Sequence, residues 1–111
     1  MKISKELLKG STSLMVLRVI AEQDRYGYQI IQEIARRSSE VFRLNEGTLY
    51  PILHTMEKEG YLECYRKESE TGRERKYYSI TAQGKLHLTA RMEEWKAYSE
   101  AVDGVLAGEL L

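Results

Sequence analysis

Leu44-Asn45-Glu46-Gly47-Thr48-Leu49-Tyr50-Pro51-Ile52-Leu53 is the stretch of this 111-residue sequence that decides the fold. Asn45 is a favourable N-cap residue, so a helix is predicted to begin there. An apolar stripe at helical spacing follows it: Leu49, Ile52, Leu53 and Met56. Gly60 stands where a glycine typically ends a helix. Pro51 would clash one turn back, but Gly47 lies there, so we expect a distorted first turn in a continuing helix.

Two more helices are predicted before this stretch. The first runs from Lys5 to about Gln23, because apolar residues recur there at three-, four- and seven-residue spacing. The segment Asp24–Gly27 is predicted to be a turn. A second, short helix then runs to about Arg37, and its buried face consists of Ile30, Ile31 and Ile34.

A β-hairpin is predicted after Gly60. Two segments rich in aromatic and β-branched residues, Tyr61–Lys67 and Arg75–Ile80, flank the polar loop Glu68–Glu74. Tyr77 and Tyr78 point to opposite faces of a strand, so we expect one in the core and one partly exposed. Thr81 is a plausible N-cap for a last helix that runs from Ala82 to about Ala107.

This last helix carries a heptad seam with one polar member. The spacing is 4, 3, 4, 3 and 4 along Leu88, Met92, Trp95, Ser99, Val102 and Leu106. The apolar seam of a long helix at the end of a small domain must be buried against another surface. A second copy of the same chain is the simplest way to bury it. We therefore expect a homodimer with Leu88, Met92, Trp95, Val102 and Leu106 at its interface. The alternative is that the seam packs on its own domain.

The order helix, helix, helix, hairpin, helix predicts a mainly α fold with a small β-hairpin. It is the order of a winged helix-turn-helix followed by a long C-terminal dimerisation helix. We expect residues 1–81 to form the DNA-binding domain and residues 82–111 to form the dimerisation helix.

In a winged helix-turn-helix the third helix enters the major groove of DNA. With its apolar stripe inward, this helix turns a small polar face outward. Its candidates for base and phosphate contacts are Thr48, Tyr50, His54, Thr55 and Lys58. The alternative, an ordinary solvent-facing helix surface, would usually carry more Glu and Lys.

The loop of the hairpin adds basic residues to this surface. Arg73, Arg75 and Lys76 surround a glycine-bearing turn, and guanidinium groups on a loop suit phosphates or a narrow minor groove. Glu74 in their midst opposes such a contact. A solvated hairpin tip is the alternative interpretation.

The charge of the chain leaves a rival function open. It has 17 basic and 17 acidic residues, whereas a DNA-binding domain is usually basic. A winged helix can also serve as a protein–protein interaction module without specific DNA binding, or as a ligand sensor with weak DNA affinity. A DNA-binding protein should lose affinity steeply as salt rises, and a protein-interaction module should not.

Catalysis and metal binding are not indicated. His54 and His87 lie on different predicted helices, no zinc-ligand spacing occurs, and no cofactor motif is present. Cys64 is the single cysteine, so we expect a small buried side chain, with a redox-sensing thiol as the alternative. No apolar run is long enough to span a membrane. A cytoplasmic protein is the expectation.

Four ordered blocks of the sequence resemble the PadR family of winged-helix regulators. They are Leu8-Lys9-Gly10, Tyr26-Gly27-Tyr28, the segment Leu44–Leu53 quoted above, and the segment Gly72–Gly84 with Gly72-Arg73-Glu74-Arg75-Lys76-Tyr77-Tyr78 at its start. The match extends from about Leu7 to Val105, and the single long last helix resembles the short-chain branch of the family. Each block alone is a weak signal, but the ordered set is specific.

The resemblance implies a dimeric repressor that binds a palindromic operator in double-stranded DNA. It places Thr48 and Tyr50 on the recognition helix and the three wing cations on the wing. It also adds Tyr28, on the second helix near the DNA backbone. His54 and Thr55 depart from the family pattern, which often has basic residues at these positions.

The resemblance further implies an effector site. Some short-chain relatives bind flat, apolar compounds between their subunits, on a tryptophan of the last helix that Trp95 matches. The lining residues would be Leu14, Leu17, Met92, Trp95 and Ser99. The alternative is that Trp95 is the largest core residue of the dimer. A ligand that favours one spacing of the subunits would release the operator by shifting the population.

Overall fold

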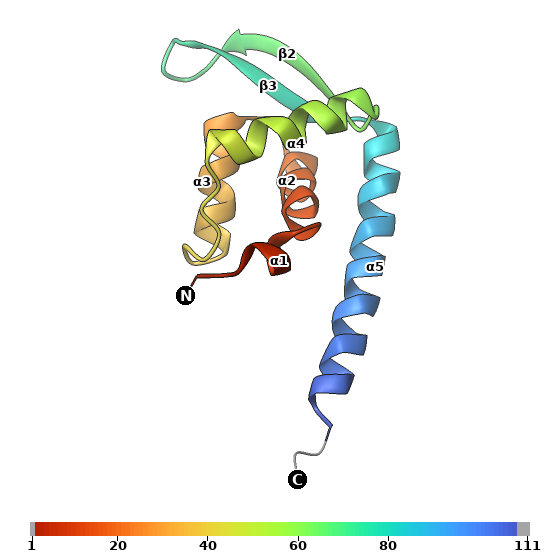
Figure 1. Cartoon of the computed structure of the whole chain (residues 1–111). Helices are drawn as coiled ribbons and strands as arrows, with labels where there is room; N and C mark the ends of the chain where they lie inside the picture. The colour runs from red at the N-terminus through yellow and green to blue at the C-terminus, as the bar shows by residue number, and fades with distance from the viewer. Residues whose placement is uncertain (1, 109–111) are drawn as a thin grey trace.

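The structure is a computed structural model that describes residues 2–108. It contains five helices and a three-stranded antiparallel sheet of order β1-β3-β2 in that part of the chain. Along the chain, the elements are α1 (Lys5–Leu8), α2 (Ser11–Glu22), β1 (Arg25–Tyr26), α3 (Gly27–Arg37), α4 (Glu46–Lys58), β2 (Leu62–Glu68), β3 (Glu74–Ile80) and α5 (Ala82–Leu106). This arrangement confirms the predicted mainly α winged helix-turn-helix with a long C-terminal helix (Figure 1).

The predicted first helix, Lys5–Gln23, is wrong at its start, because it is two helices. Gly10 has a φ of 87°, a left-handed conformation that interrupts the helix and begins α2. Leu7 consequently lies on the separate α1 and is 70% exposed instead of packing in the core. The apolar spacing alone does not reveal this break, because glycine is tolerated inside a helical pattern.

The predicted turn Asp24–Gly27 is also wrong, because Arg25 and Tyr26 form the edge strand β1. Arg25 pairs with Tyr78 of β3, and Tyr26 pairs with Tyr77. A strand of two residues shows no alternation in the sequence, so it leaves no periodic signal.

The third strand explains why both tyrosines of β3 are buried, where one was expected to be partly exposed. Tyr78 is 2% exposed in the main core, and Tyr77 is 5% exposed on the opposite face. Tyr26 meets the Tyr77 ring edge-on, with 5.3 Å between centroids, and Tyr65 stacks on it at 5.7 Å. These two rings shield Tyr77 from solvent.

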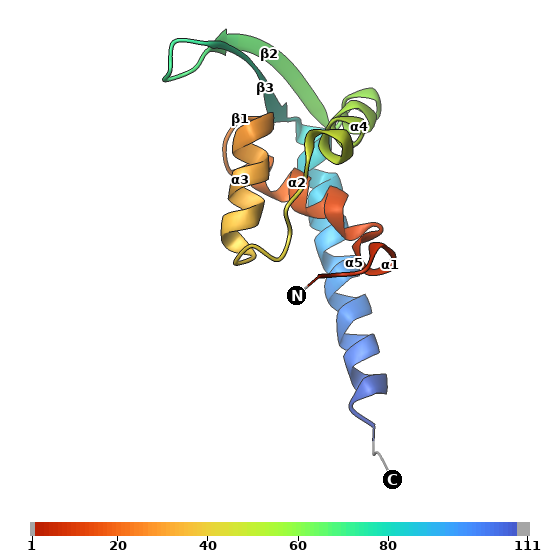
Figure 2. The ribbon, with the colours of Figure 1, turned by 60° about the vertical axis from the view of Figure 1, so that its left-hand side comes forward.

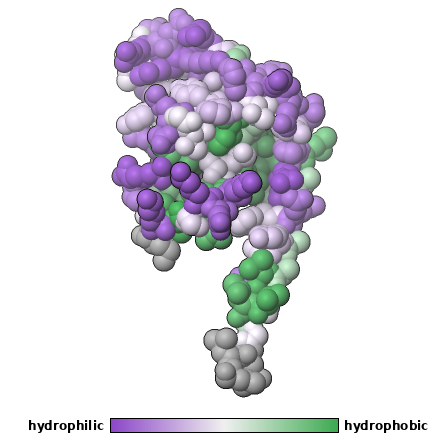
Figure 3. Space-filling model, viewed as in Figure 1, coloured by the Kyte–Doolittle hydropathy of each residue, from purple (hydrophilic) through white to green (hydrophobic). Residues whose placement is uncertain are grey.

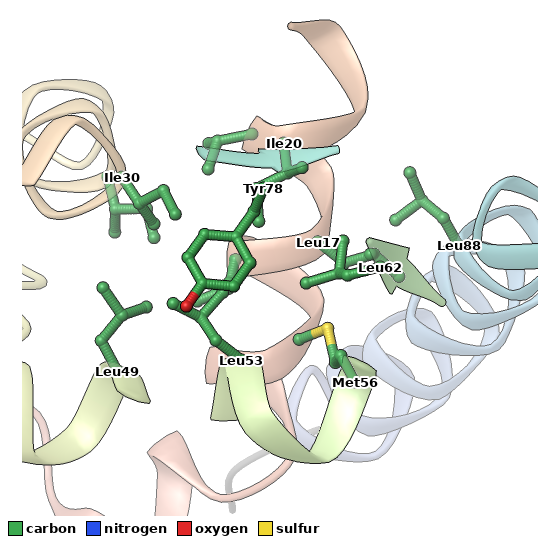
Figure 4. Close-up of a cluster of buried hydrophobic side chains, with 12 residues drawn as sticks. Leu17, Ile20, Ile30, Leu49, Leu53, Met56, Leu62, Tyr78 and Leu88 are labelled. Atoms are coloured by element: carbon green, nitrogen blue, oxygen red, sulfur yellow. The ribbon is translucent and has the colours of Figure 1, made fainter. Parts of the chain in front are cut away.

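The core lies where α2, α3 and α4 meet the inner face of the sheet. Figure 4 shows Leu49 and Leu53 of α4 beside the Tyr78 ring, Met56 beside Leu62, and Leu88 beyond them on α5. The other buried members come from α2 and α3: Val16, Leu17, Val19, Ile20, Ile30 and Ile34. Burying one such side chain contributes about 1.5–3 kcal/mol, so this cluster fixes the angles between the three helices.

Helix α4 has the predicted course. It continues through Pro51 and is followed by Gly60, which has a φ of 84°. The Tyr61 N–H donates to the Met56 carbonyl at 2.9 Å, and the Gly60 N–H donates to the Glu57 carbonyl at 3.0 Å. These two bonds form a Schellman motif, which confirms the predicted glycine stop.

Helix α5 begins as predicted and then leaves the body of the protein (Figures 1 and 2). The Gly84 N–H donates to the Thr81 side chain at 2.9 Å, so Thr81 is the N-cap. The longest dimension of the structure, 61 Å, is about twice the next, 30 Å. None of the helices described here is long and apolar enough to cross a membrane.

We predict that Gly84→Ala destabilises the fold. A Cβ at this position would lie 2.2 Å from the Tyr61 carbonyl oxygen and 2.8 Å from Ile80 Cγ1, so either the helix or the start of β2 must shift. The expected loss in the free energy of unfolding is about 2 kcal/mol, the scale of core overpacking. Urea unfolding followed by circular dichroism measures it.

Gly104→Ala is the matched control on the same helix. A Cβ there meets no atom within 4 Å among the described residues. Because alanine favours a helix over glycine by about 1 kcal/mol, this change should stabilise the protein slightly. Equal effects of the two substitutions would contradict the close approach at Gly84.

Candidate nucleic-acid interface

Helix α4 presents a polar face to solvent. Its apolar side chains Leu49, Leu53 and Met56 are buried, whereas the five residues predicted to contact DNA are all exposed: Thr48, Tyr50, His54, Thr55 and Lys58. The Asn45 side-chain oxygen accepts a hydrogen bond from the Thr48 N–H at 2.9 Å. This cap fixes the first turn of α4 and so the place where Thr48 begins the exposed face.

Tyr50 is anchored although it is 43% exposed. A Cβ on Gly27 would lie 2.6 Å from the Tyr50 hydroxyl oxygen, so the ring packs directly on the buried first residue of α3. The neighbouring Tyr28 is exposed, and its hydroxyl accepts a hydrogen bond from the Gln32 amide at 2.7 Å. Tyr50 and Tyr28 therefore lie around the same helix start, each with its ring held by a neighbour.

The tip of the wing, Ser69–Arg73, is an ordered turn. The Ser69 N–H donates to the Arg73 carbonyl at 2.8 Å, and the Ser69 hydroxyl donates to the same oxygen at 3.0 Å. Gly72 provides the left-handed residue, with a φ of 83°. Arg73 is exposed on this turn, so its guanidinium can reach a partner outside the chain.

Arg75 and Lys76 make contacts within the chain instead. The Arg75 guanidinium lies 5.2 Å from the centre of the Tyr26 ring, and its Nε is buried without a hydrogen-bond partner within residues 2–108. Lys76 Nζ lies 3.8 Å from Glu57 Oε1 on α4. The structure thus separates Arg73, exposed on the turn, from the other two predicted wing cations, which are half-buried on β3.

Two exposed cations of β2 were not among the predicted contact residues. Arg66 is paired with Glu74 across the hairpin at 3.6 Å, and Lys67 Nζ lies 4.6 Å from the centre of the Tyr77 ring. Both lie in the stretch from Arg66 to Lys85, which has six basic and three acidic residues, and this excess of basic residues is the sequence signal that points to them.

The outer face of the wing is attached to the loop after α2. The Tyr65 hydroxyl donates to the Asp24 carboxylate at 2.5 Å, and this hydrogen bond, with some burial and the negative charge of the acceptor, raises the pKa of Tyr65 to about 12. Because Tyr65 also stacks on Tyr77, the middle of β2 is held against β1 and the loop before it.

Cys64 is exposed, so the expectation of a buried cysteine is wrong. Its thiol donates to Glu57 Oε2 at 3.1 Å, and this hydrogen bond, with some burial, raises the thiol pKa. A raised pKa leaves less thiolate at neutral pH, which is the opposite of what a reactive cysteine needs.

A concave groove lies between α2, α3 and α5. Its volume is about 570 Å³, within the range of drug-sized ligand pockets. Of the predicted effector residues, Leu14, Met92 and Trp95 line this groove together. Leu17 does not, because it is buried in the core, and Ser99 lies one turn farther along α5. Arg18, Arg37 and Lys96 also line the groove. Arg18 and Arg37 are both ion-paired with Glu22 of α2.

The predicted dimer seam divides into two parts. Leu88 is 7% exposed and packs into the core of its own chain. From Met92 onward the apolar positions are exposed in the single chain: Met92, Trp95, Val102 and Leu106. Figure 3 shows the hydrophobic surface on the part of α5 that extends beyond the body.

Comparison with known proteins gives consistent matches. Residues 16–90 match the model of the transcriptional regulator PadR-like family. The chain is 37% identical over 106 residues to an uncharacterized protein of Lysinibacillus sphaericus, covering 96% of this chain and 97% of the relative. It is 31% identical to the protein of Mycobacterium tuberculosis named transcriptional regulator Rv3488, covering 95% and 92% of the two chains.

Solved structures agree with the sequence matches. The crystal structure of a PadR-like transcriptional regulator from Bacillus cereus superposes with a TM-score of 0.83 at 32% identity. The alignment covers 95% of this chain and all of the other. The fold is thus shared over nearly all of this chain and over the full length of the Bacillus cereus protein.

We predict that Asn45→Ala lowers the free energy of unfolding by about 1 kcal/mol, because the Thr48 N–H loses its side-chain acceptor. Asn45→Ser should retain most of the stability, since serine also caps helices. Urea unfolding of the three proteins measures the difference. An Asn45→Ala protein as stable as the wild type would mean that the cap does not stabilise α4.

Proposed function

Because this chain belongs to the PadR-like family of transcriptional regulators, we propose that it represses transcription by binding a specific sequence of double-stranded DNA. The observation that carries this proposal is the exposed polar face of α4 in a fold that also carries an ordered wing tip. An amide-capped helix with hydroxyl, imidazole and ammonium groups on its free face matches what base edges and phosphates require.

In the proposed complex, α4 lies in the major groove. Thr48 and Tyr50, in the N-terminal half of the helix, approach base edges, and His54, Thr55 and Lys58 approach bases or phosphates farther along. Tyr28 lies by the DNA backbone at the start of α3. Arg73 at the wing tip contacts the adjacent phosphates or minor groove.

We propose that the regulator acts as a homodimer. The support is the exposed apolar surface of α5 from Met92 to Leu106, which a second α5 would bury. Residues 1–81 then form the DNA-binding domain and residues 82–111 the dimerisation segment. Two copies of α4 placed about 34 Å apart, one turn of DNA, would read a pseudo-palindromic operator.

The groove at Trp95 is the proposed site of a flat, apolar effector. It is lined by Leu14, Met15, Met92 and Trp95, and it lies between the helix that carries the dimer seam and two helices of the DNA-binding domain. A ligand that binds one arrangement of these helices more tightly shifts the population toward it. In the ligand-bound arrangement, the distance between the two copies of α4 no longer matches the operator, so the repressor releases the DNA.

The docking of α4 predicts that Tyr50→Ala weakens binding by about tenfold or more, because one base contact is worth roughly 1–3 kcal/mol. The measurement is fluorescence anisotropy with a duplex that the wild-type protein selects from a random-sequence pool. Tyr50→Phe keeps the ring on Gly27 and removes only the hydroxyl, so it distinguishes the contribution of the hydroxyl from that of the ring packing. Unchanged binding by Tyr50→Ala, with the fold intact by circular dichroism, would contradict this docking.

The dimer predicts that Val102→Glu yields monomers, because it places a charge on the exposed part of the seam. Ala97→Glu is the matched control, since Ala97 is exposed on the same helix but away from the seam residues. Sedimentation equilibrium measures both. A Val102→Glu protein that remains dimeric would rule out α5 as the interface.

A further inference from the structure

Glu57 of α4 touches both strands of the wing. Its Oε1 lies 3.8 Å from Lys76 Nζ on β3, and its Oε2 accepts the hydrogen bond from Cys64 Sγ on β2 at 3.1 Å. The Lys76 ammonium also lies 5.5 Å from the centre of the Tyr78 ring, on the inner face of the sheet. One carboxylate therefore links the proposed recognition helix to the two strands that carry the wing tip.

The Glu57 contacts lie at a different place on the hairpin from the backbone connection between α4 and the wing. The backbone joins α4 to β2 through Gly60 and Tyr61, at the base of the hairpin. Cys64 pairs with Tyr78 and Lys76 pairs with Arg66, so the Glu57 contacts lie farther up the hairpin. Arg66, opposite Lys76, is exposed and forms an ion pair with Glu74, which lies closer to the tip. Glu57 thus restrains the middle of the hairpin, and a change in the angle of the hairpin at this point would move the wing tip.

We propose that Glu57 is a positioning residue for DNA binding, which sets the angle of the wing to α4 so that Arg73 and the exposed face of α4 engage one duplex. In this role Lys76 is a partner of Glu57 and not a phosphate contact. The inference rests on the proposed DNA-binding function, but it assigns to Glu57 and Lys76 a task that direct DNA contact would not give them.

The sign of the effect distinguishes the two roles of Lys76. If Lys76 bound phosphate, the nearby Glu57 carboxylate would oppose DNA, and its neutralisation would raise affinity. If Glu57 positions the wing, its neutralisation frees the wing and lowers affinity, in spite of the lost negative charge. Each role thus predicts an opposite change for the same substitution.

The first test compares Glu57→Gln with Glu59→Gln by anisotropy on the selected duplex at one salt concentration. Glu59 is an exposed acid at the end of the same helix, so both variants remove one negative charge near the same surface. We expect Glu57→Gln to bind about threefold more weakly than Glu59→Gln, the scale of a partly exposed ion pair. Equal or tighter binding by Glu57→Gln would overturn the proposal.

A double-mutant cycle measures the coupling between two substitutions in DNA affinity, which a general loss of stability would not produce. Lys76→Gln should weaken binding by a similar factor, and the double variant should be no weaker than either single one, since both break the same contact. In an Arg73→Gln background, Glu57→Gln should have no further effect, because the wing tip then has no contact to position. Additive losses in either cycle would contradict the positioning role.

The single cysteine reports the contact without DNA. Glu57 raises the pKa of the Cys64 thiol, so Glu57→Gln should shift the pH profile of Cys64 alkylation by iodoacetamide to lower pH. Glu59→Gln should leave the profile unchanged. Identical profiles would show that Glu57 does not hold the wing in solution, and absent DNA binding by the wild type would overturn the proposed function as well.

Discussion

The burial of one stripe of α4 is the constraint on which the rest of the structure depends. Leu49 and Leu53 are completely buried against α2, α3 and Tyr78 of the sheet. Because an α-helix has one orientation that buries such a stripe, this packing decides which side chains face solvent. The small polar face with Thr48, Tyr50 and Thr55 is exposed as the geometric complement of the core, and the Asn45 cap and the Gly60 stop set its two ends.

The sequence was sufficient to predict the features that repeat or follow strong local rules. The apolar stripe of α4 and the heptad pattern of α5 repeat over several turns of helix. The Asn45 cap and the hairpin follow strong residue preferences. The predictions that were wrong concern features that depend on one residue or on tertiary contacts. The left-handed Gly10 splits the first helix, and the two-residue strand β1 covers Tyr77; neither has a period.

The candidate site was predictable to a similar degree. The exposed residues of α4 follow from the helical period alone, and they all lie where it puts them. The contacts of the wing cations do not follow from local pattern, because the partners of Arg75 and Lys76 come from other elements: the Tyr26 ring and the Glu57 carboxylate. Cys64 likewise depends on a tertiary contact that has no local pattern: it is exposed, and its thiol donates to the Glu57 carboxylate of α4. The proposed DNA-binding surface thus combines a helix face set by the core with a wing held by polar contacts.

The most direct test of the central claim, sequence-specific DNA binding, is an anisotropy titration at two salt concentrations. It compares DNA from upstream of the gene that encodes this chain with a scrambled duplex of the same composition. The account predicts tight binding to the upstream duplex alone, with an affinity that falls steeply as salt rises because counterions are released from phosphates. Equal or absent binding to both duplexes, or binding that salt does not weaken, would contradict it and favour a protein-interaction module.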